Sequence, residues 1–208
     1  MFDPSVYVIT SAGLVPGRTH VDVAIATIAG GATAVQIRAP ELPDDDLLDT
    51  ARAIAAACRG AGVAFVVNDR VDVALAVGAD GVHLGQSDEP ATGRPRLGPG
   101  RVLGVSVEDP AQALAAEAFG ADYFGVTVWS TTTKPAAPGV GLERLRTIVR
   151  ATVLPVVGIG GIDASNAGDV IRTGAAGVAV ISAVGAADDP EAATREIAAA
   201  VERVRRTM

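Results

Sequence analysis

Short apolar runs rich in Val and Ile recur along the whole chain, and they restrict its possible folds more than any other feature. The eight runs are 6–10 (VYVIT), 34–38 (AVQIR), 64–68 (AFVVN), 81–85 (GVHLG), 103–107 (LGVSV), 123–127 (YFGVT), 155–160 (PVVGIG) and 177–182 (GVAVIS). They are apolar almost throughout rather than alternating, which is typical of strands in a parallel sheet covered by helices.

Ala-rich segments with a helical pattern lie between these runs. The clearest covers 44–62, where three Asp residues favour a helix N-terminus and Gly62 favours its end. Similar segments cover 109–121, 142–152, 163–175 and 189–207. Only 86–100 is irregular enough that we expect no full helix in it.

This alternation predicts an α/β protein, a (β/α)₈ TIM barrel that occupies 1–208 as a single domain. A doubly wound open sheet is the alternative. Eight evenly matched units without a binding fingerprint after the first run favour the barrel.

Composition excludes several classes of protein. The net charge of −7 argues against general nucleic-acid binding, and one Cys excludes an intramolecular disulfide framework. No signal peptide is apparent, and no apolar run approaches the roughly 20 residues of a membrane helix. We therefore expect a cytoplasmic protein that does not enter membranes, and the sequence is compatible with a homo-oligomer.

In a barrel, chemistry collects at the carboxyl ends of the strands. Polar residues stand at the ends of most of these runs, namely Thr10, Gln36, Arg38, Asn68, Asp69, His83, Gln86, Asp88, Ser106, Thr127 and the loop through Lys134. An Arg facing a barrel interior is costly without an anion, so Arg38 predicts an anionic ligand. Singly, Asp69 is also explained as a helix N-cap, His83 as a core histidine and Asp88 as a turn residue.

Two features predict a phosphate site and a metal site. GIGGI (158–162) and the turn at Ile181 and Ser182 follow the seventh and eighth strands, where this fold commonly binds phosphate. Asp69 and Asp88 end neighbouring strands, and their hard oxygen ligands beside a phosphorylated substrate favour Mg²⁺.

Taken in order, these motifs resemble those of the thiamine phosphate synthase family. The similar segments are VQIR, VNDR, GVHLGQSD, GVSV, TTTKP, GIGGI and VISA, which run from about residue 6 to residue 185. The resemblance implies a transferase of thiamine biosynthesis. Its small-molecule substrates would be an aminopyrimidine methyl pyrophosphate and a thiazole phosphate, joined with loss of pyrophosphate.

The resemblance also implies roles for individual residues. Asp69 and Asp88 would hold Mg²⁺ against the pyrophosphate, while Arg38 and Lys134 would neutralise its developing charge. The implied hydrogen-bond donors are Gln36, Asn68 and Ser106, and the implied thiazole phosphate site consists of Thr131, Thr133, Gly161, Ile181 and Ser182.

Two departures from the family pattern keep alternatives open. The family usually has Lys where Pro40 stands, so one cation of the pyrophosphate site is missing, and Arg18, Arg94 or Arg96 are candidates to replace it. The family often has His where Glu108 stands. A thiazole tautomerase, which relies on that His, and a non-catalytic or weakly active phosphate-binding homologue are the alternatives.

Overall fold

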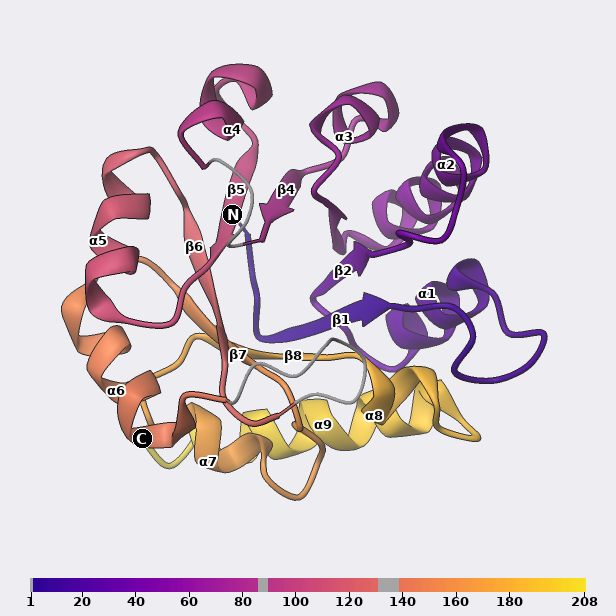
Figure 1. Ribbon diagram of the computed structural model, residues 1–208. Coiled ribbons are helices and arrows are strands. Elements are labelled where there is room, and N and C mark those ends of the chain that lie inside the picture. Colours follow the sequence, from indigo (N-terminus) through magenta and orange to yellow (C-terminus); the bar gives the residue numbers. More distant parts are fainter. Residues whose placement is uncertain (1, 86–89, 131–138) are drawn as a thin grey trace.

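The computed structural model describes residues 2–85, 90–130 and 139–208. Eight parallel strands close into a barrel in the order of the sequence (Figure 1). The strands are β1 (Val6–Thr10), β2 (Ala34–Ile37), β3 (Ala64–Asn68), β4 (Gly81–Leu84), β5 (Val102–Ser106), β6 (Tyr123–Thr127), β7 (Val156–Ile159) and β8 (Gly177–Val180). Pairing of β8 with β1 closes the sheet, so none of the strands in the described ranges is an edge strand.

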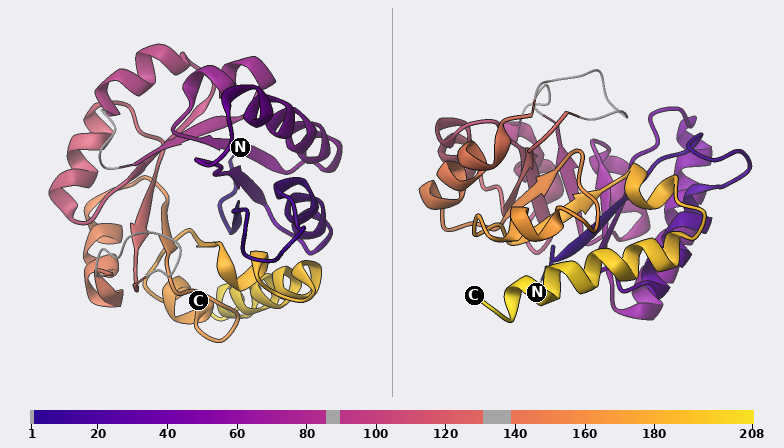
Figure 2. Two further views of the ribbon diagram at one scale, coloured as in Figure 1. Left: turned by 45° about the vertical axis from the view of Figure 1, so that its right-hand side comes forward. Right: turned by 90° about the horizontal axis from the view of Figure 1, so that it is seen from below.

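Helices surround the barrel and run back from the carboxyl ends of the strands to their amino ends. They are α1 (His20–Ala29), α2 (Asp44–Ala61), α3 (Val71–Val77), α4 (Pro90–Leu97), α5 (Pro110–Ala118), α6 (Gly141–Ala151), α7 (Ala167–Ile171), α8 (Ser182–Gly185) and α9 (Pro190–Arg205). The end of α9 and the start of β1 therefore lie on the same face of the barrel, as the right-hand view of Figure 2 shows.

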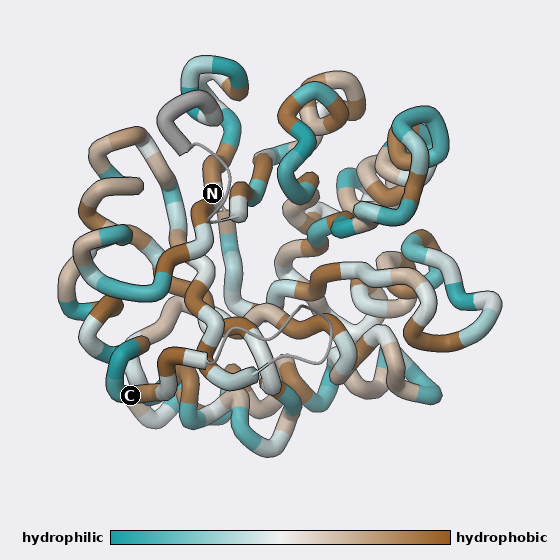
Figure 3. The backbone as a smooth tube through the Cα atoms, in the orientation of Figure 1, coloured by the Kyte–Doolittle hydropathy of each residue, from teal (hydrophilic) through white to brown (hydrophobic). Residues whose placement is uncertain are grey.

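Apolar side chains form two separate cores. The larger one fills the layer between strands and helices, and includes Val35, Ile54 and Phe124. The smaller one fills the barrel itself and includes Tyr7 and Tyr123, both almost fully buried. Both strand faces are thus covered, which explains why the strands are apolar throughout, whereas the helices alternate between hydrophobic and hydrophilic stretches (Figure 3).

The barrel prediction is confirmed, and each of the eight apolar runs overlaps one strand, with β5 beginning one residue before its run. The expectation that 86–100 lacks a full helix is wrong, since α4 forms two turns there with Pro95 inside it. The helix expected to open at Asp163 begins at Ala167, because the Asp163 carboxylate instead accepts the Ser165 N–H at 2.8 Å and holds a turn.

Within the described ranges, every helix is too short or too polar to cross a membrane.

Candidate active site

A narrow cavity opens at the centre of the barrel, at the carboxyl ends of the strands. Its polar lining residues are Tyr7, Gln36, Arg38, Asn68, His83, Ser106, Tyr123 and Thr127. The enclosed volume is about 30 Å³, enough for a water-sized group. A ligand ring would therefore lie over the mouth of this central cavity, with only a small substituent inside it.

A second, wider cavity of about 300 Å³ lies beside it, between the ends of β7 and β8. Its lining includes the predicted phosphate residues, Gly161, Ile181 and Ser182, together with Ser130. Ile159, Ala179 and Ile181 line both cavities. Two ligands placed in them would consequently be neighbours.

The backbone of the second cavity depends on glycine. Gly160 and Gly161 have φ angles of 91° and 64°, a left-handed conformation that other residues adopt at a cost. The Asn166 side chain donates to the Gly161 carbonyl at 2.8 Å and fixes this turn. A Cβ on Gly161 would lie 3.1 Å from Trp129 Cβ, so a larger residue would crowd the cavity.

Asp69 follows β3 in a strained backbone conformation. Its φ is 60°, and among the described residues it is the only one other than glycine with a positive φ. Its N–H donates to the His83 carbonyl at 2.8 Å, which fastens the turn to β4. The alternative that Asp69 is a helix N-cap is wrong, since Arg70 precedes α3 and no side-chain cap is formed. Strain held in this way is common at functional sites.

Hydrogen bonds connect the polar side chains inside the barrel. Gln36 Nε2 donates to Tyr7 Oη at 2.7 Å, and Tyr7 Oη lies 3.0 Å from Tyr123 Oη. His83 Nδ1 lies 3.0 Å from Tyr123 Oη, and its Nε2 lies 3.0 Å from Ser106 Oγ. His83 is thus a hydrogen-bonded residue of the barrel interior, as its explanation as a core histidine predicts. It also lines the central cavity.

Arg38 is half-buried at the cavity mouth, and an acidic residue lies nearby. Burial raises the pKa of Glu41, but the hydrogen bond from His20 and the charges of His20 and Arg38 lower it overall. His20 Nε2 lies 2.8 Å from Glu41 Oε1, and His20 Nδ1 lies 2.8 Å from Thr10 Oγ1. The Glu41 carboxylate therefore remains charged next to the predicted anion site.

Arg18 and Arg94, two of the three candidates to replace the family Lys at position 40, already donate to other groups of the protein. The Arg18 guanidinium donates to the carbonyls of Gly185, Ala187 and Asp188, and ties the loop before α1 to the end of α8 and the segment that follows it. Arg94 donates to three backbone carbonyls and to Asp122, at the amino ends of the strands. Neither guanidinium can serve the rim in this arrangement, and Arg96 is exposed on α4.

Four predicted site residues, Asp88, Thr131, Thr133 and Lys134, lie outside the described residues. Those that the structure describes meet at one rim. Gln36, Arg38, Asn68 and Ser106 line the central cavity, Gly161, Ile181 and Ser182 line the second, and Asp69 follows Asn68. In the described ranges no group of three or more metal-ligating side chains occurs.

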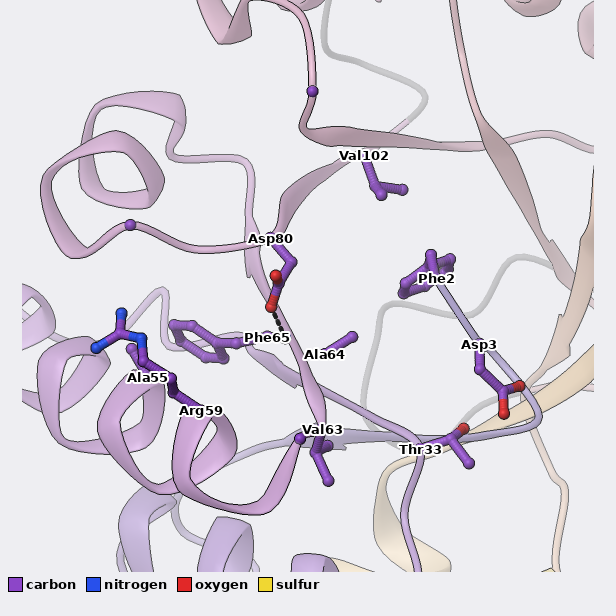
Figure 4. A pocket seen from close by; sticks show the side chains of 13 residues that line it. Phe2, Asp3, Thr33, Ala55, Arg59, Val63, Ala64, Phe65, Asp80 and Val102 are labelled. Carbon is purple, nitrogen blue, oxygen red and sulfur yellow. Dashed lines mark hydrogen bonds between the residues drawn. The ribbon is translucent and has the colours of Figure 1, made fainter.

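A further cavity, of about 540 Å³, lies at the opposite face of the barrel (Figure 4). Phe2, Arg59, Asp80 and Val102 are among its lining residues, and Asp80 accepts the Phe65 N–H at 2.8 Å. It is larger than the two rim cavities, but it lies at the amino ends of the strands. Barrel enzymes place their chemistry at the carboxyl ends.

Three residues near the site are not indicated by the sequence. Tyr7 and Tyr123 occur inside apolar runs, and His20 carries no signal. The Tyr7 and Tyr123 hydroxyls are 116 residues apart in the sequence, so only the closed barrel brings them together, whereas His20 reaches Thr10 through the packing of α1 on β1. Strand alternation could have placed Tyr7 and Tyr123 on the inner face with Gln36, but not their mutual contact.

Residues 6–184 match the family model described as Thiamine monophosphate synthase. A thiamine-phosphate synthase of Chloroflexus aurantiacus is 50% identical over 201 residues, covering 96% of this chain and 93% of that protein. That of Moorella thermoacetica is 48% identical over 202 residues, covering 96% of both. A solved structure of thiamine phosphate pyrophosphorylase from Pyrococcus furiosus superposes with a TM-score of 0.89 at 41% identity, covering 98% of both chains.

Proposed function

The chain belongs to the thiamine monophosphate synthase family and is a transferase that makes thiamine phosphate, and we propose that its two rim cavities hold the two substrates. The observation that supports this is their shared wall of Ile159, Ala179 and Ile181. Bond formation between two molecules requires them in contact, and adjacent sites supply that proximity.

The aminopyrimidine would lie over the central cavity, with its pyrophosphate toward Arg38. Departure of the pyrophosphate leaves a pyrimidine cation and concentrates negative charge on the leaving oxygens. Arg38 and Ser106 are fixed on β-strand ends before that charge develops, which is the condition for strong electrostatic stabilisation. Gln36 and Asn68 add hydrogen bonds, and Lys134 adds a second cation.

The residues at the end of β3 suit a hard cation. Asp69 supplies carboxylate oxygens, and the strained turn keeps it at the rim beside Asn68, whose amide donates to it. We propose that Asp69 and Asp88 bind Mg²⁺, which when bound would supply positive charge to the pyrophosphate oxygens. The turn after β3 holds the Asp69 carboxylate at the rim before the ligand arrives.

Metal removal tests this proposal. With both substrates present, dialysis against EDTA should reduce thiamine phosphate formation at least about 10²-fold, and Mg²⁺ should restore it. Product is measured as the fluorescent oxidised thiamine phosphate. Turnover that EDTA leaves unchanged would contradict the metal assignment. Tight substrate binding without turnover would favour the non-catalytic alternative, and conversion of thiazole carboxylate isomers without the pyrimidine would favour the tautomerase.

We propose that the thiazole phosphate occupies the second cavity, with its phosphate at the backbone N–H groups that follow β7 and β8. Gly161→Ala adds a Cβ at 3.1 Å from Trp129 Cβ in a left-handed residue. We expect KM for the thiazole phosphate to rise about 10-fold, because crowding and strain together cost about 1–2 kcal/mol. KM for the pyrimidine pyrophosphate should not change.

Gly62→Ala is the matched control for this substitution. Gly62 has a φ of 69° but ends α2 away from the rim, with no atom within 4 Å of an added Cβ. It should lower stability by about 1 kcal/mol and leave both KM values unchanged. Equal effects of Gly161→Ala on both substrates would contradict the assignment of this cavity.

We also propose that residues 1–208 act as a single domain and that the protein works in the cytoplasm. The strand order, which closes only when β8 reaches β1, supports a single unit. Thermal unfolding in one cooperative transition is the expected observation.

A further inference from the structure

Five side chains form one continuous hydrogen-bonded chain across the barrel interior. In order they are Gln36 on β2, Tyr7 on β1, Tyr123 on β6, His83 on β4 and Ser106 on β5. The successive distances are 2.7, 3.0, 3.0 and 3.0 Å. Substrate can reach Ser106 at the cavity mouth, whereas the two tyrosines are almost fully buried.

The donors and acceptors favour one direction for this chain. The Gln36 amide nitrogen can only donate, so Tyr7 Oη accepts from it. Either hydroxyl can donate in the Tyr7–Tyr123 pair, and the direction that gives every proton an acceptor has Tyr7 donate to Tyr123 Oη. Tyr123 then donates to His83 Nδ1, which places the proton of the neutral imidazole on Nε2. That proton goes to Ser106 Oγ, so the Ser106 hydroxyl accepts within the chain and its own proton is available at the cavity.

The opposite direction is disfavoured. It would direct two donated protons at Tyr7 Oη and leave Tyr7's own proton facing the apolar interior around Phe2 and Ala34. Burial raises the pKa of Tyr7 and, together with Tyr7 itself, the pKa of Tyr123, so both hydroxyls stay protonated as donors.

Two strand glycines make room for the chain. A Cβ on Gly104 would lie 2.2 Å from the Tyr123 ring, and a Cβ on Gly125 would lie 3.0 Å from His83 Cε1. Any side chain at Gly104 would therefore displace Tyr123. Glycine at these two positions of β5 and β6 leaves room for the Tyr123 and His83 rings, and so permits the hydrogen bonds between them.

We propose that Tyr7 and Tyr123 are positioning residues, which set the His83 tautomer and thereby direct the Ser106 proton to the leaving pyrophosphate. This inference rests on the proposed function only in its last step, the donation by Ser106. The direction of the chain inside the barrel is independent of the substrate.

Nitrogen NMR of histidine-labelled enzyme tests the direction. The sequence has only two histidines, and His20→Gln identifies the His83 signals. In the ligand-free protein we expect His83 protonated at Nε2 and not at Nδ1, and in Tyr123→Phe a mixture of both tautomers. A wild-type His83 protonated at Nδ1 would overturn the proposal.

A double-mutant cycle tests the link to catalysis. Ser106→Ala should lower kcat about 10²-fold, as expected for loss of one preorganised donor, and Tyr123→Phe about 10-fold. The double variant should be no worse than Ser106→Ala, because Tyr123 acts through Ser106. A loss that multiplies to about 10³-fold would show that Tyr123 acts independently, and would overturn the positioning role.

Tyr7→Phe is the control matched to Tyr123→Phe. It also tests the proposal if Tyr123→Phe does not fold. Tyr123 can still donate to His83 in it, so the tautomer should persist and kcat should fall less than about 3-fold. Tyr7→Phe that shifts the tautomer as far as Tyr123→Phe would contradict the order of the chain. A fully active Ser106→Ala would reject the proposed role of Ser106, while the NMR result would still decide the direction.

Discussion

Asp69→Gly is expected to lower kcat/KM by about 10³-fold or more without destabilising the fold. The loss follows from removal of a carboxylate proposed to hold the metal against the leaving group. Stability should be retained or rise by up to about 1 kcal/mol, because glycine adopts the φ of 60° without the cost that Asp bears. Steady-state kinetics and thermal unfolding measure the two effects on one preparation.

Two substitutions complete this experiment. Asp69→Asn keeps the size of the side chain and tolerates the same backbone, so it should be nearly as inactive for loss of charge alone. Asp72→Asn removes an exposed carboxylate three residues later, which pairs with Arg70, and should retain activity within about twofold. An active Asp69→Gly would refute the metal role, and a loss of stability above about 2 kcal/mol would refute the strain.

The fold was predictable because the apolar runs of parallel strands, and the helical patterns between them, can be recognised in the local sequence. The runs at 6–10, 64–68 and 123–127 coincide with β1, β3 and β6 residue for residue. The prediction for 86–100 was wrong because Gly and Pro there indicate no regular structure. In the structure, Arg94 stabilises α4 by donating to the backbone carbonyls of residues 98, 101 and 120. Those contacts depend on the tertiary structure.

The candidate site was predictable where position on the strand decides it. Gln36, Arg38 and Ser106 follow from the inner face and the carboxyl end of their strands, and each lines the central cavity. The partners inside the barrel could not be predicted, since Tyr7 and Tyr123 lie 116 residues apart in sequence. The same holds for His20, whose contacts with Thr10 and Glu41 depend on how α1 packs.

We propose that Arg38 supplies a large share of the positive charge at this rim, because Pro40 stands where the thiamine phosphate synthase family usually has Lys. The side chains of Arg18 and Arg94 are occupied by backbone carbonyls, and Glu41 places a negative charge near Arg38. Arg38→Ala is accordingly expected to lower kcat/KM about 10³-fold, with most of the loss in kcat, because the leaving group becomes more negative only as its bond breaks.

Arg38→Lys separates charge from geometry. A lysine keeps the charge but not the planar pair of donors that fits two phosphate oxygens. Arg38→Lys should therefore still have a kcat/KM about 10–10²-fold below that of the wild type. Arg172→Ala is the control. Arg172 is an exposed arginine at the C-terminal end of α7, where it pairs with Asp169, and its loss should leave activity unchanged. If Arg38→Ala raised KM for the pyrimidine pyrophosphate and left kcat unchanged, Arg38 would bind the ground state only. The charge on the departing pyrophosphate would then fall to Lys134, and Lys134→Ala would have to be the variant that loses kcat.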